Sequence, residues 1–266
     1  MRLLNAVKRA LKACAPLIFV PRCASCMQVL PSTDMPLCER CMQAYLTESK
    51  KLCKGCGRMH RYCVCRISFG ERRFPLVHIT GYDIKRSSVS KNMILNLKDN
   101  RFDNAFDFLA HQMYTTLKER YMRLFERGTV VITYVPRSGK ARRKAGHDQS
   151  EEIAKRVSAL SGAPFVPLFC NNSSSLQKKL GKAERMQNAL DSYALINPEL
   201  RLTGRIVVII DDIVTTGSSI GACGTLAVRN GAKAVIPLVC ARTQSQKSVH
   251  SSFEDTESYY EADEGE

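Results

Sequence analysis

Strand-like and helix-like hydrophobic patterns alternate through the middle of the chain. Four short apolar runs predict buried strands: Leu76–Tyr82, Thr129–Val135, Arg205–Ile210 and Ala234–Cys240. Apolar residues at helical spacing predict helices between them: Val89–Leu97, Phe102–Phe125, Ser150–Leu160 and Ser218–Arg229. This alternation predicts an α/β domain over residues 73–243, with a parallel sheet that is covered by helices on both faces.

The two ends of the chain have a different pattern. Residues 1–20 place apolar side chains on one face, and three bases interrupt them, so we predict an amphipathic helix rather than a signal peptide. The helix is expected to pack on the neighbouring module, with membrane contact as the alternative. Residues 244–266 are rich in Ser and then acidic, which predicts a disordered tail. No segment is long and apolar enough to span a bilayer.

Charge narrows the choice of partners. The chain carries 40 Lys and Arg against 25 Asp and Glu, a formal charge of +15. Seven of the acids lie in the last fourteen residues, so residues 1–252 hold all the bases and 18 acids. Such a body favours an anionic partner, which includes nucleic acid, a phosphorylated small molecule and a membrane surface. Simple solubility is the alternative interpretation.

Paired cysteines define a second module over residues 21–72. Eight of the 12 cysteines form four closely spaced pairs: Cys23 with Cys26, Cys38 with Cys41, Cys53 with Cys56, and Cys63 with Cys65. Two such turns complete a tetrahedral sulfur site for zinc or an iron–sulfur cluster. We predict a double zinc ribbon with two structural zinc ions. A single occupied site is the alternative, and His60 could replace a ligand of the last pair. Reduced thiols predict a cytoplasmic protein.

The segment after the third predicted strand carries the strongest functional signal. Asp211 and Asp212 directly follow the apolar run Val207–Ile210. A turn rich in hydroxyls then leads into a helix, and it contains Thr215, Thr216, Gly217, Ser218 and Ser219. Ligands of open α/β folds bind at the carboxyl ends of strands. Main-chain N–H groups and hydroxyls at such a turn attract phosphate, and adjacent carboxylates suit sugar hydroxyls. An ordinary strand with a Ser or Thr cap would not explain the acid pair.

This segment resembles the 13-residue phosphoribosyl-pyrophosphate (PRPP) motif of type I phosphoribosyltransferases. The resemblance implies that Asp211 and Asp212 bind the ribose hydroxyls and that residues 215–219 bind the 5-phosphate. It also implies that the loop after the second predicted strand holds pyrophosphate. This loop comprises Pro136, Arg137, Ser138, Gly139 and Lys140. Without the resemblance, it is merely a basic loop.

The order of a Cys-pair module and this domain resembles the ComF family of bacterial competence-associated proteins, over residues 14–243. Leu97-Lys98 stands where that family has Leu-Lys-Tyr-x-Gly-Asp, and Gly146-His147-Asp148-Gln149 stands where it has Gly-Phe-Asn-Gln. The departures concern the side of the second substrate. Residues that the resemblance assigns to this side or to a lid are His147, Gln149, Gln177, Arg185 and Asn188.

The resemblance implies two compatible functions. One is a phosphoribosyltransferase that binds PRPP with Mg²⁺, and the other is a factor that handles single-stranded DNA during DNA uptake under the control of a phosphoribosyl ligand. A nucleobase-salvage enzyme is a further alternative. Sparse aromatic residues in the Cys-rich module weaken the case for DNA binding. A homodimer is a candidate assembly, because this fold often dimerises.

Overall fold

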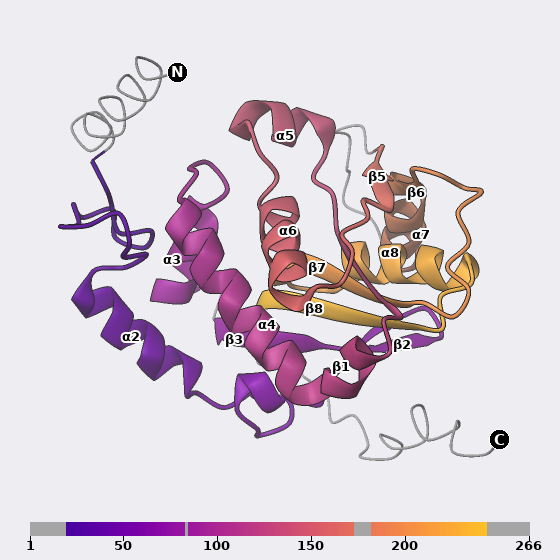
Figure 1. Ribbon diagram of the computed structural model, residues 1–266, viewed down its shortest axis with the longest axis horizontal. Coiled ribbons are helices and arrows are strands. Elements are labelled where there is room, and N and C mark those ends of the chain that lie inside the picture. Colours follow the sequence, from indigo (N-terminus) through magenta and orange to yellow (C-terminus); the bar gives the residue numbers. More distant parts are fainter. Residues whose placement is uncertain (1–19, 83–84, 173–181, 244–266) are drawn as a thin grey trace, which may run out of the picture.

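The computed structural model describes residues 20–82, 85–172 and 182–243 (Figure 1). The predicted N-terminal helix, the predicted acidic tail and Gln177 therefore lie outside the described residues. Within the described residues, no helix is both long enough and apolar enough to cross a membrane.

The central sheet has four parallel strands, as the sequence pattern predicts. Their spatial order is β3 (Val77–Tyr82), β8 (Ala234–Thr243), β7 (Ile206–Val214) and β4 (Val130–Tyr134). All three pairings are parallel, which confirms the predicted α/β class. Two strands run past their predicted ends. β7 continues from Ile210 through Asp211 and Asp212 to Val214, and β8 continues to Thr243, because the two strands keep pairing there.

Successive residues of β7 point to opposite faces of the sheet, and each face is covered by its own layer of helices. Val208 and Ile210 belong to the core shared with α3 (Val89–Asn96), α4 (Asp103–Glu126) and α6 (Gln149–Ser161). Val207 and Ile209 belong to the core beneath α8 (Ser218–Arg229). Figure 1 shows these helices on the two sides of the sheet. A strand that is buried on both faces must be apolar at every position, which explains the uninterrupted Ile206–Ile210 run.

The remaining elements follow less regular patterns. Those in the Cys-rich module and its link to the sheet are α2 (Glu39–Ser49), the 3₁₀ turn η1 (His60–Tyr62), β1 (Arg66–Phe69) and β2 (Arg72–Pro75). Those around the sheet are α5 (Gly139–Ala145), β5 (Phe169–Asn171), α7 (Lys182–Ser192) and β6 (Tyr193–Leu195). β1 and β2 form an antiparallel hairpin, and β5 pairs antiparallel with β6, which follows α7.

The hairpin β1–β2 lies against a glycine-bearing face of α8 and its N-cap. Gly217, Gly221 and Gly224 share this face, and the side chains of Ile67, Phe69 and Phe74 fill the space that Cβ atoms would need. A Cβ on Gly221 would lie 2.7 Å from Phe69, and one on Gly217 would collide with Ile67. Gly217 also has φ +80°, which favours glycine. The hairpin therefore packs directly against the turn that precedes α8.

Candidate functional site

The acid pair stands at the open carboxyl edge of the sheet. β4 ends at Tyr134, which pairs with Ile210, whereas β7 runs on beside β8 through Val214. Asp211 and Asp212 therefore project beyond the last residue of β4, and both are partly buried rather than sealed in the core. This is the edge at which open α/β sheets bind ligands.

The two carboxylates have different partners. Asp211 Oδ1 accepts hydrogen bonds from the main-chain N–H of Asp212 at 2.9 Å and from Ser150 Oγ at 3.2 Å. Asp212 Oδ2 accepts a hydrogen bond from Gln149 and lies 3.4 Å from Lys98 Nζ. Two acids side by side need such donors, because each disfavours the charge of the other. Burial, and then the charge of Asp212, raises the pKa of Asp211 well above its ordinary value.

The start of α6 supplies donors to the acid pair because Asp148 caps this helix. Asp148 Oδ1 accepts from Ser150 N at 3.1 Å, and its Oδ2 accepts from Arg137 N at 2.8 Å. One buried side chain thus holds both the helix start and the loop after β4. Burial raises the pKa of Asp148. Sequence reasoning did not assign a role to Asp148 or Ser150, although an Asp directly before a helix is an N-cap signal.

The predicted phosphate turn is a left-handed bend at the surface. Thr215 and Thr216 are exposed, while Gly217 is buried and caps α8 without a side-chain acceptor. Thr216 Oγ1 lies 2.9 Å from Ser218 Oγ, and Ser218 and Ser219 are partly exposed. The first N–H groups of α8 have no acceptor within the helix, and its dipole favours an anion there. The turn can therefore offer hydroxyl and N–H donors to a phosphate.

The predicted pyrophosphate loop leaves β4 and becomes helical at once. Pro136 and Arg137 lead to Ser138, which caps α5 through Ala141 N at 3.3 Å, and Gly139 and Lys140 form its first turn. The basic segment is thus a short helix rather than a loop throughout. It buries none of its side chains, and Figure 1 shows it away from the sheet. Arg137 instead turns inward, where Nη1 donates to Lys98 O at 3.0 Å.

The predicted second-substrate residues fall into two places. His147 is buried, with Nδ1 3.0 Å from Ala145 O and Nε2 2.8 Å from Leu97 O, so both nitrogens face main-chain carbonyls. Gln149 contacts the acid pair through Asp212. Arg185 and Asn188 lie on α7, where Asn188 O accepts from Ser192 Oγ at 2.6 Å. The structure therefore brings Gln149 to the acids, and it uses His147 to hold the loop against α3.

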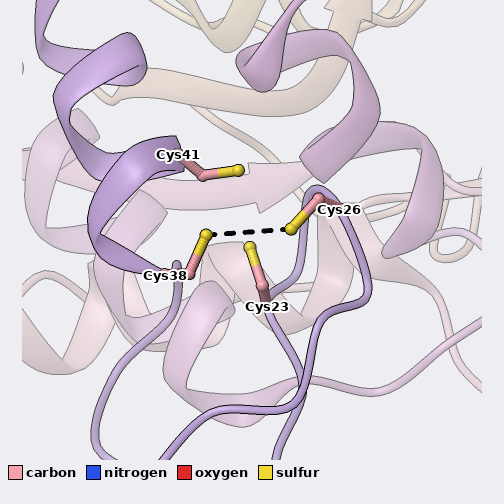
Figure 2. A group of neighbouring side chains, drawn as sticks. All are labelled: Cys23, Cys26, Cys38 and Cys41. Carbon is pink, nitrogen blue, oxygen red and sulfur yellow. Dashed lines mark hydrogen bonds between the residues drawn. The ribbon is translucent and has the colours of Figure 1, made fainter.

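The first group of four cysteines has the geometry of a tetrahedral sulfur site. The Sγ atoms of Cys23, Cys26, Cys38 and Cys41 all lie within 4.8 Å of one another, and Figure 2 shows them pointing toward a common centre. Cys26 and Cys38 are 3.7 Å apart. A tetrahedral ion with metal–sulfur bonds of about 2.3 Å separates its sulfurs by ~3.8 Å. The four residues therefore fit a metal ion such as zinc.

The second group joins Cys53, Cys56, Cys63 and Cys65, again within 4.8 Å. Its hydrogen-bonded Sγ pairs are 3.6 to 3.9 Å apart, so it fits the same ion. Both predicted groups of four cysteines are thus present, and Cys65 lies among the four sulfurs of the second group. His60 and His78 also approach Cys53, within the same 4.8 Å limit. Burial lowers the pKa of His60 to about 4, which leaves it neutral.

Each group contains the same kind of CxxC turn, here called a knuckle, over residues 22–29 in the first group and 52–59 in the second. An antiparallel bridge closes Arg22 with Val29 in the first and Leu52 with Met59 in the second. In both, the residue after the CxxC pair donates its N–H to the carbonyl of the first cysteine, at 2.9 Å from Met27 and 2.8 Å from Gly57. Both residues have a left-handed φ, +64° and +70°. The second knuckle uses the residue type that this backbone favours, and the first does not.

Burial and hydrogen bonds between neighbouring thiols shift the pKa of several cysteines in the two groups. Burial, with neighbouring thiols, raises the pKa of Cys41, and the hydrogen bond with Cys53 raises that of Cys63. Hydrogen bonds from Cys63 and Cys65 lower the pKa of Cys53. A metal that requires thiolates would therefore release protons when it binds. Arg242, at the end of β8, hydrogen-bonds to Cys65 and offers positive charge to such a centre.

Comparison with known proteins yields distant structural similarity. No protein-family model and no curated protein matches the sequence. A purine phosphoribosyltransferase from Pyrococcus horikoshii Ot3 aligns with 56% of this chain and 94% of its own, at 17% identity and a TM-score of 0.31. A hypoxanthine phosphoribosyltransferase from Staphylococcus aureus aligns with 54% of this chain and 70% of its own, at 10% identity and a TM-score of 0.29. The structure itself shows an α/β protein with a four-stranded parallel sheet and two Cys₄ groups that could hold structural zinc.

Proposed function

We propose that this protein binds PRPP as its Mg²⁺ complex at the carboxyl end of β7 and transfers the phosphoribosyl group to an acceptor. The observation that carries the proposal is one continuous segment. Asp211 and Asp212 project past the end of β4, and the exposed turn Thr215–Ser219 follows directly. Carboxylates for sugar hydroxyls and donors for a phosphate are thus one turn apart on a single strand-to-helix connection.

The neighbouring residues suit the rest of such a ligand. Gln149 and Ser150 hold the two carboxylates as hydrogen-bond acceptors, so the acids are preorganised for ribose hydroxyls. Arg137, in the loop after β4, donates its N–H to Asp148, which directly precedes the two residues that contact the acids. The diphosphate is expected at this loop. When bound with the substrate, Mg²⁺ would supply positive charge to the diphosphate oxygens.

The proposed transfer is a direct displacement at C1 of the ribose. A nucleophilic nitrogen or oxygen of the acceptor forms a bond to C1 of the ribose, and the bond between C1 and the diphosphate oxygen breaks. The diphosphate leaves with the electron pair, and the proton of the acceptor passes to solvent water. The chain contributes position and charge, which are the main sources of rate in such displacements.

Calorimetric titration with PRPP and Mg²⁺ tests the binding. The double variant Asp211→Asn and Asp212→Asn should bind at least ~10-fold more weakly, a loss of about 1.4 kcal/mol or more. Glu199→Gln is the matched control, because Glu199 is an exposed acid in the segment before β7. Equal affinity of the double variant and the control would contradict the proposal. Release of diphosphate with a panel of nucleobases then tests transfer.

The two Cys₄ groups are proposed to hold one zinc ion each. When bound, zinc would supply a closed tetrahedral crosslink, with no open position for a substrate. The residues of this chain provide four sulfurs per site, at the spacing that such an ion requires. A metal count of two zinc ions per chain is expected, and a count of one would support the single-site alternative.

A second proposal is that the protein contacts single-stranded DNA, as a ComF-like role in DNA uptake would require. The supporting observation is α5, which carries Lys140, Arg142, Arg143 and Lys144 and buries none of its residues. Phosphate contacts make affinity fall steeply with salt. Replacing these four bases by Gln should lower the affinity for a single-stranded oligonucleotide and flatten its salt dependence. Unchanged binding would contradict this role.

A further inference from the structure

Three consecutive residues at the end of α3 connect the first Cys₄ group to the acid pair. The side-chain amide of Asn96 donates to two main-chain carbonyls, Ala24 O at 2.9 Å and Ser25 O at 3.0 Å. These carbonyls belong to the two residues between Cys23 and Cys26. The Asn96 amide therefore hydrogen-bonds directly to the turn that carries two of the four sulfurs. Ala24 and Ser25 are themselves buried.

The next two residues contact the loop after β4. Leu97 O lies 2.8 Å from His147 Nε2, and Lys98 O accepts from Arg137 Nη1 at 3.0 Å. Leu97 has its side chain in the core at 1% exposure, which fixes the backbone here. The two carbonyls therefore hold both ends of the basic segment that includes α5.

The side chain of Lys98 completes the connection. Its ammonium lies 3.4 Å from Asp212 Oδ2, the oxygen that Gln149 also contacts. The Lys98 side chain is 35% exposed and that of Asp212 is 15% exposed, so the cation reaches the acid from the solvent side. It would lie beside both the ribose hydroxyls and the diphosphate of a bound phosphoribosyl ligand.

We propose that Lys98 is a positioning residue of the phosphoribosyl site and that the first Cys₄ group, when it holds its metal, fixes Lys98 through Asn96. The inference rests on the proposed function for the identity of the ligand. A metal ion holds Cys23 and Cys26 at one separation, which fixes the carbonyls of Ala24 and Ser25. Without a metal, no bond joins the two sulfurs, so the turn that carries Ala24 O and Ser25 O is less constrained and its hydrogen bonds with Asn96 are weaker.

Such coupling must act in both directions, because linkage is reciprocal. Occupancy of the first Cys₄ group should raise the affinity for PRPP, and PRPP should slow the loss of zinc from that group. In the described part of the chain, the hydrogen bonds of residues 96–98 do not reach the second group, so its zinc should respond less.

The chain offers a matched control for the test. Asn104 makes the same kind of grip on the Cys-rich module, with its amide 2.9 Å from Thr33 O and 2.6 Å from Met35 O. It lies on α4 and is not followed by contacts to the acid pair. We therefore compare Asn96→Ala with Asn104→Ala, and Lys98→Met with Lys98→Arg, after zinc counting and circular dichroism.

Calorimetry with PRPP and Mg²⁺ gives the first readout. Asn96→Ala should bind at least ~5-fold more weakly than Asn104→Ala, within the range of ordinary allosteric coupling. Lys98→Met should lose affinity without losing zinc, and Lys98→Arg should recover much of it, since the cation is retained. Equal affinities of the two Asn variants, or of the two Lys variants, would overturn the proposal.

Hydrogen exchange gives a readout that does not need the ligand. Peptides over residues 137–149 should lose protection in Asn96→Ala, and in the wild-type chain once a chelator has removed its zinc, but not in Asn104→Ala. If the wild-type chain binds no PRPP, the proposed function fails, and this exchange pattern alone decides the coupling. Unchanged protection in both Asn96→Ala and the chelated chain would refute it.

Discussion

Replacing Gly221 with Ala tests whether the hairpin β1–β2 is seated against α8 as tightly as the structure shows. The new Cβ would lie 2.7 Å from Cβ, Cγ and Cδ2 of Phe69. Carbon atoms pack best at about 3.5–4.0 Å, so three contacts would be roughly 1 Å too short. Because Cβ of Phe69 is fixed to the strand, a change of rotamer cannot relieve the contact, and the hairpin must move.

Two opposing effects decide whether Gly221→Ala raises or lowers the free energy of unfolding. Ala in place of Gly inside a helix stabilises by about 1 kcal/mol. Overpacking of a filled core destabilises by about 1–3 kcal/mol, and the upper half of that range applies when backbone has to shift. We therefore expect Gly221→Ala to lower the free energy of unfolding by about 1–2 kcal/mol.

Gly224→Ala is the matched control on the same helix. Its Cβ would meet only the edge of the Phe74 ring, at 3.0 Å from Cζ and 3.3 Å from Cε1 and Cε2. The ring can tilt away, so the helical gain should offset the contact and leave stability within about 0.5 kcal/mol of wild type or slightly higher. Urea unfolding of both zinc-loaded variants measures the difference. If Gly221→Ala were as stable as Gly224→Ala, the packing argument would be wrong.

Three other predictions concern the acid pair and the knuckles. The pKa of Asp211 is raised on folding, so its ionisation destabilises the folded state progressively as the pH rises from the unfolded value of 3.8 to the folded one. Asp211→Asn should therefore melt at a higher temperature than wild type at pH 7 but not at pH 3.5, while it loses PRPP affinity; a lower melting temperature at pH 7 would refute this reasoning. Met27→Gly should stabilise by roughly 0.5–1 kcal/mol, since Met27 holds φ +64°, and Gly57→Ala should destabilise by a similar amount in the same denaturant series. Chelation of zinc should lower the melting temperature in a pH-dependent manner, because protons then compete for the thiolates, and a melt that is indifferent to chelator would contradict the structural role.

Local sequence patterns were sufficient to predict the strand, turn and helix around the acid pair. Ile206–Ile210 is apolar at every position and therefore central, and the glycine and hydroxyl run after Val214 marks a helix start whatever surrounds it. The four cysteine pairs, three CxxC and one CxC, are equally local, because such a turn needs only its own residues to bring two sulfurs together. These features could be predicted because neighbours in sequence determine them.

Tertiary structure decided what reaches the acids. β7 extends past Ile210 only because β8 continues beside it after β4 has ended, and a single strand's pattern does not contain its neighbours' lengths. Lys98 meets Asp212 across 114 positions of sequence, through contacts of α3 with both the knuckle and the loop after β4. The sequence of α8 also does not show that the side chain of Phe69 packs against Gly221. Such contacts depend on how distant elements pack, and many residue types could fill those positions, so periodicity and spacing leave them open.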